Sequence, residues 1–325
     1  MASLPEIFKK YTGILRSFRG TYFINNLLNA QKLKRNKALY EKHGLKKSIF
    51  GSISSSDFKQ SVGETPWLDR PDALVKLEAH PEFAQFDDSV KNQLRQWVDK
   101  GYIILKGFFT TEEAEALNTE VDQILNHGKT DFNYGNRVMD AHRVSGLIDQ
   151  QHFRNKKMLY LLNFIMGEPI HPFQTINFIE GSEQKAHSDF IHMTSEPKGY
   201  LIATWTALEN TDAGNGPLFY YPGSHKLPYI MSGDFDTGHG RWFLGNNTYK
   251  HYEDKIEELI KQHQLEKQYF HAEKGDVLIW HANLLHGGSP IKEQGRTRKS
   301  MVAHYFCENV ISYHEISQRP AILDN

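Results

Sequence analysis

The sequence predicts a mainly β protein with flanking helices. Its second half contains runs that alternate in polarity with a period of two, which is typical of strands with one buried face. Two earlier stretches, 90–98 and 114–125, instead carry apolar side chains at helical spacing. With 325 residues, 39% of them hydrophobic, the chain is long enough to bury a large core, and an all-β barrel with added helices fits one domain of this length.

Two helices are expected before the β-rich half. The apolar stripe of the first consists of Val90, Leu94, Trp97 and Val98. Gly101 ends this helix, because glycine readily adopts the left-handed conformation that closes a helix, and a strand is expected from Tyr102 to Leu105. Thr110 and Glu113 form a capping box that begins the second helix, and Gly128 ends it. We expect both helices to brace the outside of the barrel.

The first fifty residues are strongly basic. They contain eleven Lys and Arg against Glu6 and Glu41, a net charge of +9 that leaves −10 for the remainder. Apolar residues recur there at helical spacing, namely Ile7, Tyr11, Ile14, Leu15, Phe18 and Tyr22. The pattern predicts an amphipathic helix whose apolar face packs on its own domain. The alternative is contact with an anionic membrane surface or a partner protein.

We divide the chain into two regions. The serine-rich stretch 51–56 is typical of a linker, so residues 1–60 are predicted to be a basic helical extension and residues 61–325 the main domain. Between residues 228 and 268 the polarity rises and glycines and aromatic residues are interspersed. This insertion is interpreted either as a lid over a substrate or as a surface excursion.

A histidine and an aspartate lie between two predicted strands. His187-Ser188-Asp189 follows the alternating run 173–179 and precedes the β-rich run 200–208. A His-x-acid pattern alone is weak, because this composition produces about two by chance. The sequence holds three others, which begin at His80, His251 and His271. Only the pattern at His187 has strands on both sides and partner residues downstream.

The segment from Asp276 to Pro290 offers a second histidine ligand. It contains His281 and His286, which are five residues apart and point to opposite faces if the chain is extended. Glycines follow His286 and permit a close approach of the backbone, which favours that residue. Two histidines and one carboxylate can hold one face of a ferrous ion and leave the opposite positions open.

Arg298 offers a positive charge to an acidic ligand, and Ser300 offers a hydroxyl group. They are two residues apart at the start of a predicted strand, so they share a face and are able to grip a carboxylate together. The simpler interpretation of the run 296–299 is a basic strand end in water. Arg296 lies nearer the loop and is interpreted as a solvated charge.

Several ordered motifs resemble the phytanoyl-CoA dioxygenase-like branch of the iron(II)- and 2-oxoglutarate-dependent oxygenases. The resemblance runs from about Gly101 to Phe306. Its motifs are Gly101–Phe109, His187-Ser188-Asp189, Trp205–Leu208, Asn215–Leu218, Pro222–Lys226, Gly275-Asp276, His286-Gly287 and Arg298. The resemblance implies that the β-rich core is a double-stranded β-helix, the jelly-roll or cupin-like fold.

The same resemblance implies individual roles for residues of the site. It implies that His187, Asp189 and His286 ligate iron(II), and that Arg298 binds the distal carboxylate of 2-oxoglutarate. Trp205, Ser300, Ser289 and Gln174 are further candidates for contacts with the cosubstrate, although Trp205 and Gln174 are equally well explained as parts of the core and the sheet. The implied cofactor and cosubstrates are Fe²⁺, 2-oxoglutarate and O₂.

The implied activity is hydroxylation of a C–H bond in a small molecule, with release of succinate and carbon dioxide. Two alternatives are a non-catalytic cupin-like module that binds a metal or ligand, and a zinc-dependent hydrolase, since two histidines and an aspartate also suit zinc. Arg298 argues against both, because it has an obvious task only if a dicarboxylate enters. The residues leave open the substrate and the oxidative outcome.

The sequence argues against a disulfide-bonded protein and against a membrane-spanning one. The single cysteine, Cys307, excludes an internal disulfide and suits a reducing cytoplasm. No apolar run is long enough to span a bilayer, and no signal-peptide core is evident. We expect a cytoplasmic enzyme that binds no nucleic acid, with an oligomeric state that the sequence leaves open.

Overall fold

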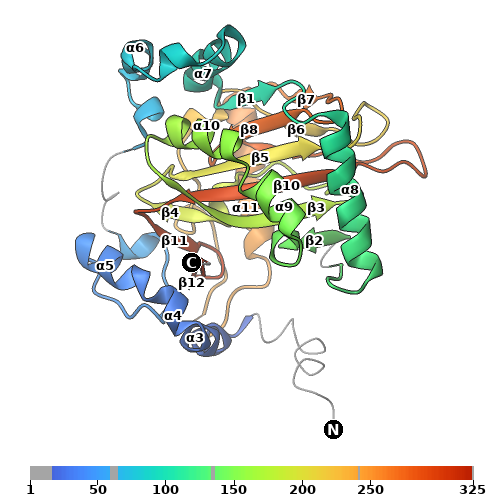
Figure 1. Ribbon diagram of the computed structural model, residues 1–325. Coiled ribbons are helices and arrows are strands. Elements are labelled where there is room, and N and C mark those ends of the chain that lie inside the picture. The colour runs from blue at the N-terminus through green and yellow to red at the C-terminus, as the bar shows by residue number, and fades with distance from the viewer. Residues whose placement is uncertain (1–16, 59–64, 133–135, 241, 324–325) are drawn as a thin grey trace.

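The centre of the protein is a six-stranded antiparallel sheet (Figure 1). The computed structural model describes residues 17–58, 65–132, 136–240 and 242–323. In spatial order the strands are β1 (Tyr102–Leu105), β8 (Val277–His281), β5 (Leu201–Ala207), β10 (Ser300–Cys307), β3 (Ile170–Phe178) and β2 (Arg137–Met139). The runs predicted as strands from their polarity therefore form the middle of one sheet, with β10 between β5 and β3.

The two faces of this sheet pack against different layers. Along β10, Met301, Ala303 and Tyr305 point to the side that the helices cover. Val302 points the other way and joins a core cluster that includes Trp205 of β5. The alternation follows from the strand period of two. A side chain on the even-numbered face of β10 is therefore placed away from the helices.

Helices cover the odd-numbered face of β10 (Figure 1). Those in front of the sheet are α8 (Thr111–Asn126), α9 (Gly146–Ile148) and α10 (Lys156–Met166), while α6 (Ala73–Ala79) and α7 (Asp88–Lys100) lie beyond β1 at the edge of the sheet. One-turn 3₁₀ helices occur at Ser55–Asp57, Trp67–Asp69, Phe83–Gln85, Ala141–Arg143, Asp189–Ile191 and Ser224–Lys226, and a π-helical turn at Asp149–Phe153. The predicted end of the first helix and the predicted start of the second helix are both confirmed. Gly101 closes α7 with a φ of 74°, and both hydrogen bonds of the Thr110–Glu113 capping box are present.

Two smaller antiparallel sheets complete the fold. One consists of β7 (Gln268–Phe270), β6 (Leu218–Tyr220) and β9 (His286–Gly288), and the other of β12 (Arg319–Pro320), β11 (Ile311–His314) and β4 (Thr194–Glu196). Leu218 and Phe270 of the first small sheet share a core cluster with Trp205 of the large sheet. The small sheet thus packs against the face of the large sheet that the helices leave free.

The described part of the N-terminal region packs onto the small sheet of β11. It contains α3 (Arg19–Leu28), α4 (Ala30–Leu33) and α5 (Arg35–Lys42). Leu39 of α5 and Ile53 form a core cluster with Ile311 and Tyr313 of β11. The stretch expected as a linker is therefore held in place, because Ile53 is buried and its N–H donates to the carbonyl of Gln318 at 2.9 Å. The division at residue 60 stays a prediction.

The predicted basic amphipathic helix lies largely outside the described residues. The residues outside the described ranges include Ile7, Tyr11, Ile14 and Leu15. Phe18 is exposed and its ring contacts Phe243, with centroids 5.4 Å apart. Tyr22 is half-buried. In the ranges that the structure describes, no helix combines the length and the hydrophobicity needed to cross a bilayer.

The insertion contains one long helix, α11 (Thr248–Gln262). Tyr252 of α11 is fully buried, and its hydroxyl accepts a hydrogen bond from the N–H of Ser188 at 2.9 Å. Ser188 lies between His187 and Asp189. The insertion therefore supports the segment His187-Ser188-Asp189 directly.

A buried carboxylate joins three parts of the chain. Glu315 accepts hydrogen bonds from the N–H and the hydroxyl of Ser55, at 2.9 and 2.6 Å. It also accepts bonds from the N–H of Ser232, at 3.1 Å, and from the Ser232 hydroxyl. Glu315 is completely buried, so these donors replace the water that an ionised carboxylate requires. The residue thus connects the N-terminal region, the start of the insertion and the chain after β11.

We predict that Glu315→Ala destabilises the protein by about 3 kcal/mol. A hydrogen bond is worth about 0.5–1.5 kcal/mol, and the half-buried donors of Ser55 and Ser232 lose their acceptor. Urea denaturation of the variant and the wild type measures the change. Glu266→Ala is the matched control, because Glu266 is exposed. An unchanged urea midpoint for Glu315→Ala would contradict the proposed role of this carboxylate.

Candidate metal centre and its cavity

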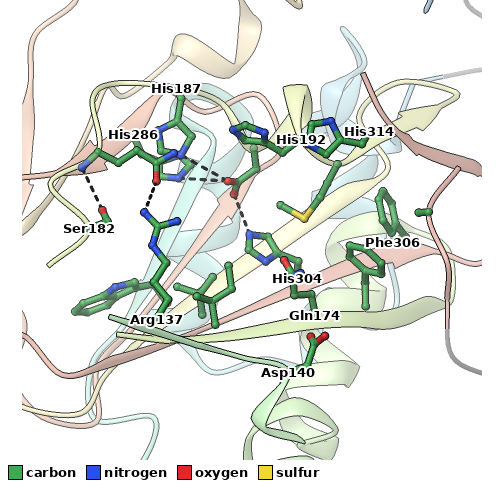
Figure 2. A pocket seen from close by; sticks show the side chains of 18 of the residues that line it. Arg137, Asp140, Gln174, Ser182, His187, His192, His286, His304, Phe306 and His314 are labelled. Carbon is green, nitrogen blue, oxygen red and sulfur yellow. Dashed lines mark hydrogen bonds and ion pairs between the residues drawn. The ribbon is translucent and has the colours of Figure 1, made fainter. Parts of the chain in front are cut away.

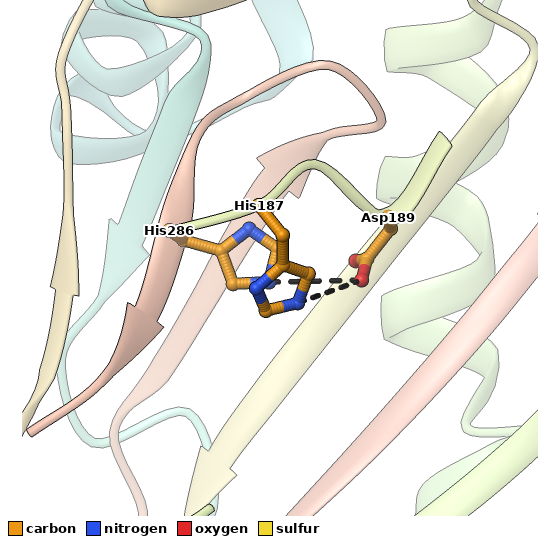
Figure 3. A group of neighbouring side chains, drawn as sticks. All are labelled: His187, Asp189 and His286. Atoms are coloured by element: carbon orange, nitrogen blue, oxygen red, sulfur yellow. Dashed lines mark ion pairs between the residues drawn. The ribbon is translucent and has the colours of Figure 1, made fainter. Parts of the chain in front are cut away.

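His187, Asp189 and His286 come together at one point between the sheets (Figure 3). His187 and His286 pair through their backbones, each N–H donating to the other's carbonyl at 2.9 Å. Asp189 begins a one-turn helix directly after this contact. Its Oδ1 lies 3.9 Å from Nε2 of His187 and 3.6 Å from Nε2 of His286. Among the described residues this is the single group of three or more acidic, His or Cys side chains arranged to hold a metal ion.

Backbone carbonyls orient both imidazole rings. Nδ1–H of His187 donates to the carbonyl of Lys185 at 2.8 Å, and Nδ1–H of His286 donates to that of Leu284 at 3.0 Å. This tautomer leaves the lone pair of each Nε2 directed at the centre of the group. Burial lowers the pKa of His187 to about 3. The ring is therefore neutral near pH 7 and offers a nitrogen ligand without first losing a proton.

Two side chains from the large sheet hold the other oxygen of Asp189. The indole N–H of Trp280 donates to Oδ2 at 2.8 Å. Nε2 of His304 lies 3.3 Å from the same atom, and Figure 2 marks this contact with a dashed line. Burial by itself raises the pKa of the Asp189 carboxyl, but the imidazoles of His286 and His304 outweigh it, so the pKa lies below its usual range. Asp189 is therefore ionised, with Oδ1 directed at the two histidines.

His281, the other histidine considered as a metal ligand, makes different contacts. Its Nε2 lies 3.0 Å from Oδ2 of Asp69, and its Nδ1 accepts a hydrogen bond from the N–H of Asn283. His281 thus closes a turn. The expected reason was incomplete, because the chain is not extended between the two histidines. A turn in which the N–H of Leu284 bonds to the carbonyl of His281 separates them.

A cavity of about 800 Å³ opens beside the three side chains. Gln174, Trp205 and Arg298 line it together with His187, Asp189 and His286. Ser289 and Ser300 are buried nearby but are not part of its lining. The hydroxyl of Ser300 has no hydrogen-bond partner among the described residues. The structure therefore brings six of the eight predicted site residues to one cavity.

Arg298 is a buried cation without a carboxylate partner among the described residues. Its side chain is 2% exposed, and Nη1 donates a 3.3 Å bond to the carbonyl of Gly216. Nε has no partner, and the guanidinium carbon lies 5.7 Å from the rings of both Phe178 and Trp205. Burial lowers the pKa of Arg298 to about 10. A desolvated charge of this kind is costly unless an anion binds to it.

Arg296 lies outside the cavity, as expected from its place near the loop. It donates two hydrogen bonds to Asp212, at 2.8 and 2.9 Å, and a third to Glu293 at 3.0 Å. Its charge is thus compensated on the surface by two carboxylates. Both arginines precede β10, which begins at Ser300, and of the two only Arg298 lines the cavity.

Sequence reasoning missed several residues of the cavity wall. His304 was recoverable, because it shares the even-numbered face of β10 with Arg298. His192, Tyr249 and His314 also line the cavity (Figure 2 shows the two histidines). These three residues come from separate segments, and no common sequence pattern links them. Burial lowers the pKa of His192 to about 4, so this ring is neutral near pH 7.

Arg137 of β2 is a further cation of the wall. Its guanidinium donates a 3.3 Å bond to the side-chain carbonyl of Gln184 (Figure 2), and its Nε has no partner among the described residues. Its guanidinium carbon lies 5.2 Å from the ring of Phe178, which Arg298 also contacts. The end of the cavity beside the candidate metal centre is therefore positively charged.

Antiparallel sheets with a buried group of two histidines and one aspartate beside a cavity match the site of non-haem iron oxygenases. The family model of phytanoyl-CoA dioxygenase (PhyH) matches residues 97–300, well over half of the chain. The chain therefore belongs to this dioxygenase family.

Curated relatives are similar in sequence over different shares of their length. Ectoine dioxygenase of Halomonas elongata is 27% identical over 246 residues, which are 70% of this chain and 71% of that protein. The peroxisomal phytanoyl-CoA dioxygenase of Bos taurus is 31% identical over 124 residues. That match covers 38% of this chain and 34% of the bovine protein. The chain thus matches about a third of the bovine enzyme.

Solved structures share the fold at low sequence identity. EctD from S. alaskensis, solved with 2-oxoglutarate and 5-hydroxyectoine, is 16% identical with a TM-score of 0.57. The match covers 84% of this chain and 94% of that chain. The non-heme alpha ketoglutarate dependent carbocyclase SnoK is 12% identical with a TM-score of 0.56, over 72% and 93% of the two chains. The antiparallel sheets with flanking helices are thus a known arrangement.

We predict that Trp280→Phe weakens the binding of a divalent metal ion. The change keeps the aromatic packing but removes the N–H that holds Oδ2 of Asp189, and such outer partners are typically worth about 10–100-fold in metal affinity. Anaerobic calorimetric titration with iron(II) measures the affinity.

The control for this measurement is Trp67→Phe. The Trp67 indole also donates one hydrogen bond, to the carbonyl of Phe164 at 3.0 Å, and does not line the cavity. Equal affinity in the wild type and Trp280→Phe would show that the indole does not position Asp189.

Proposed function

We propose that the protein is an iron(II)- and 2-oxoglutarate-dependent dioxygenase that hydroxylates an unactivated C–H bond of a small molecule. The observation that carries this proposal is one cavity that holds both a three-residue metal-ligand group and a buried arginine with no carboxylate partner among the described residues. Membership of the phytanoyl-CoA dioxygenase family supports it. The substrate is released as its hydroxylated product, together with succinate and carbon dioxide.

His187, Asp189 and His286 are the proposed iron ligands. Two imidazole nitrogens and one carboxylate oxygen suit a ferrous ion and leave its remaining positions open to the cavity. When bound, iron(II) and 2-oxoglutarate supply the reduction of dioxygen, coupled to decarboxylation of 2-oxoglutarate and oxidation of the substrate. The protein's own contribution is to fix the three ligand atoms. The carbonyls behind the histidines and the indole of Trp280 behind Asp189 do this.

Arg298 is the proposed binding residue for the distal carboxylate of 2-oxoglutarate. Its guanidinium is buried, lines the cavity and has spare donors, so a carboxylate satisfies both its charge and its geometry. The indole N–H of Trp205 also has no acceptor among the described residues and is a second proposed donor. Gln174 lines the same cavity. Contacts from Ser300 and Ser289 need a rearrangement of their side chains.

We further propose that the core is a double-stranded β-helix and that residues 61–325 form the oxygenase domain. The support is the packing of the sheet β7-β6-β9 against the large sheet through a shared cluster. The candidate metal centre lies where these layers meet, because His286 begins β9 while His304 comes from β10. The insertion at 228–268 is proposed as a lid. Its Tyr249 lines the cavity.

Anaerobic titration followed by a turnover assay tests the proposed function. The wild-type protein is expected to bind iron(II), to change its absorption spectrum when 2-oxoglutarate is added, and to form succinate when oxygen is admitted with candidate substrates. Asp189→Ala is expected to abolish succinate formation without unfolding the protein, because it removes a ligand and little core volume.

The same assay separates the alternatives. Turnover that requires zinc and proceeds without 2-oxoglutarate would indicate a hydrolase. Metal binding with no spectral response to 2-oxoglutarate would indicate a binding module. Either result would reject the oxygenase.

We predict that Arg298→Ala raises KM for 2-oxoglutarate roughly tenfold to a hundredfold, because a charged hydrogen bond is worth about 1.5–3 kcal/mol. Its free energy of unfolding should not fall, since the change removes an uncompensated buried charge. Steady-state kinetics and urea denaturation measure the two effects.

Arg296→Ala is the matched control, two residues away on the same strand end. It is expected to leave KM unchanged, because its partners Asp212 and Glu293 lie outside the cavity. A raised KM in this variant and not in Arg298→Ala would show that the roles are assigned to the wrong arginine.

A further inference from the structure

Helix α3 presents its apolar side chains to solvent. The buried residue of this helix is polar, Asn26, whose amide donates to the carbonyl of Phe50 at 3.0 Å. Phe23, Ile24, Leu27 and Leu28 are 46–82% exposed. An amphipathic helix on a globular domain normally buries such residues and exposes its polar ones. The orientation of α3 is the reverse and, within the part of the chain that the structure describes, leaves an apolar face exposed.

The apolar face of α3 continues onto the insertion. Phe18 pairs with Phe243 through the backbone, and the N–H of Arg19 donates to the carbonyl of Trp242 at 3.0 Å. The resulting surface, here called the α3 patch, consists of Phe18, Phe23, Ile24, Leu27, Leu28, Trp242 and Phe243. It holds seven of the thirteen large apolar residues that are exposed in the described chain. Such a concentration marks a docking surface rather than scattered exposure.

The charge of the segment that contains α3, α4 and α5 favours an anionic partner for the α3 patch. Residues 17–42 contain six Lys and Arg and one acidic residue, Glu41, a net charge of +5. Lys34, Lys37 and Lys42 of this segment are exposed. Exposed aliphatic and aromatic side chains beside lysines are the combination that binds an anionic bilayer surface. A second copy of the same chain would bring like charges together.

We propose that the α3 patch docks the protein on the surface of an anionic lipid bilayer. The apolar side chains enter the interface, Trp242 sits at the level of the headgroups, and the lysines face the anionic lipids. Asn25 of α3 lines the cavity, as do residues 319–322 of the segment that includes β12. Figure 1 shows α3 at the edge of the molecule next to β12. Docking therefore brings that end of the cavity close to the bilayer.

Sedimentation with vesicles tests this proposal on the full chain. The wild type is expected to sediment with vesicles of phosphatidylcholine and phosphatidylserine, less with phosphatidylcholine alone, and less as salt is added. The double change Ile24→Asp and Leu28→Asp should lower the partition coefficient at least about tenfold, because it removes two inserted side chains. Both positions are exposed, so thermal unfolding of the variant should match that of the wild type.

Val75→Asp is the matched control. Val75 is 74% exposed on α6, outside the α3 patch, and its replacement should leave vesicle binding unchanged. Failure of the wild type to sediment, or equal binding by the double variant, overturns the proposal. So does light scattering that shows a dimer which the double variant dissociates, without vesicle binding, since a second copy then covers the patch. Vesicle binding needs neither metal nor 2-oxoglutarate, so this test is independent of the proposed function.

Discussion

The backbone pairing of His187 with His286 is the contact on which the site depends. Two reciprocal hydrogen bonds at 2.9 Å join segments that are nearly a hundred residues apart. They place both imidazoles side by side, with ring centroids 4.6 Å apart. Each segment is then anchored independently. Tyr252 of α11 holds Ser188, while β9, which begins at His286, pairs with β6. The centre is thus supported by the insertion and by a small sheet.

Two buried charged side chains near this contact, Asp189 and Arg298, have different surroundings. Asp189 accepts a hydrogen bond from Trp280 and has three histidines as neighbours, and its pKa lies below the usual range. Arg298 is equally buried, but it receives one carbonyl and no carboxylate among the described residues. A protein whose only requirement was stability would not retain such a cation. The cost is understandable if Arg298 binds an anionic ligand, as we propose, because the charge is then compensated in the complex.

The N-terminal region and the insertion are integrated with the site rather than appended to it. Glu315 joins Ser55 and Ser232, and the pairing of Phe18 with Phe243 joins the same two regions at another point. Tyr249 of the insertion and Asn25 of α3 both line the cavity. A movement of the insertion would therefore be coupled to the N-terminal region. The position of the α3 patch links that coupling to the surface on which we propose the protein docks.

Local features of this protein were determined by the sequence itself, because they depend on residues close together in the chain. The Thr110–Glu113 capping box, the end of α7 at Gly101 and the bounds of β1 all follow from local conformational preferences. The face shared by Arg298 and His304 follows from strand periodicity. The motif His187-Ser188-Asp189 and its partner His286 were recognisable through family resemblance, since ordered motifs are a property of the sequence.

Tertiary structure alone decided how these local pieces face one another. The turn at Asn283 and Leu284 separates His281 from His286, so the selection of His286 does not rest on strand alternation. The support of Asp189 by Trp280 and the burial of Ile53 depend on strands paired across long sequence separations. Periodicity shows that a helix has an apolar face, but not whether that face meets the core or the solvent. That choice depends on packing against the rest of the chain, and in α3 packing buries Asn26 and leaves the apolar face outside.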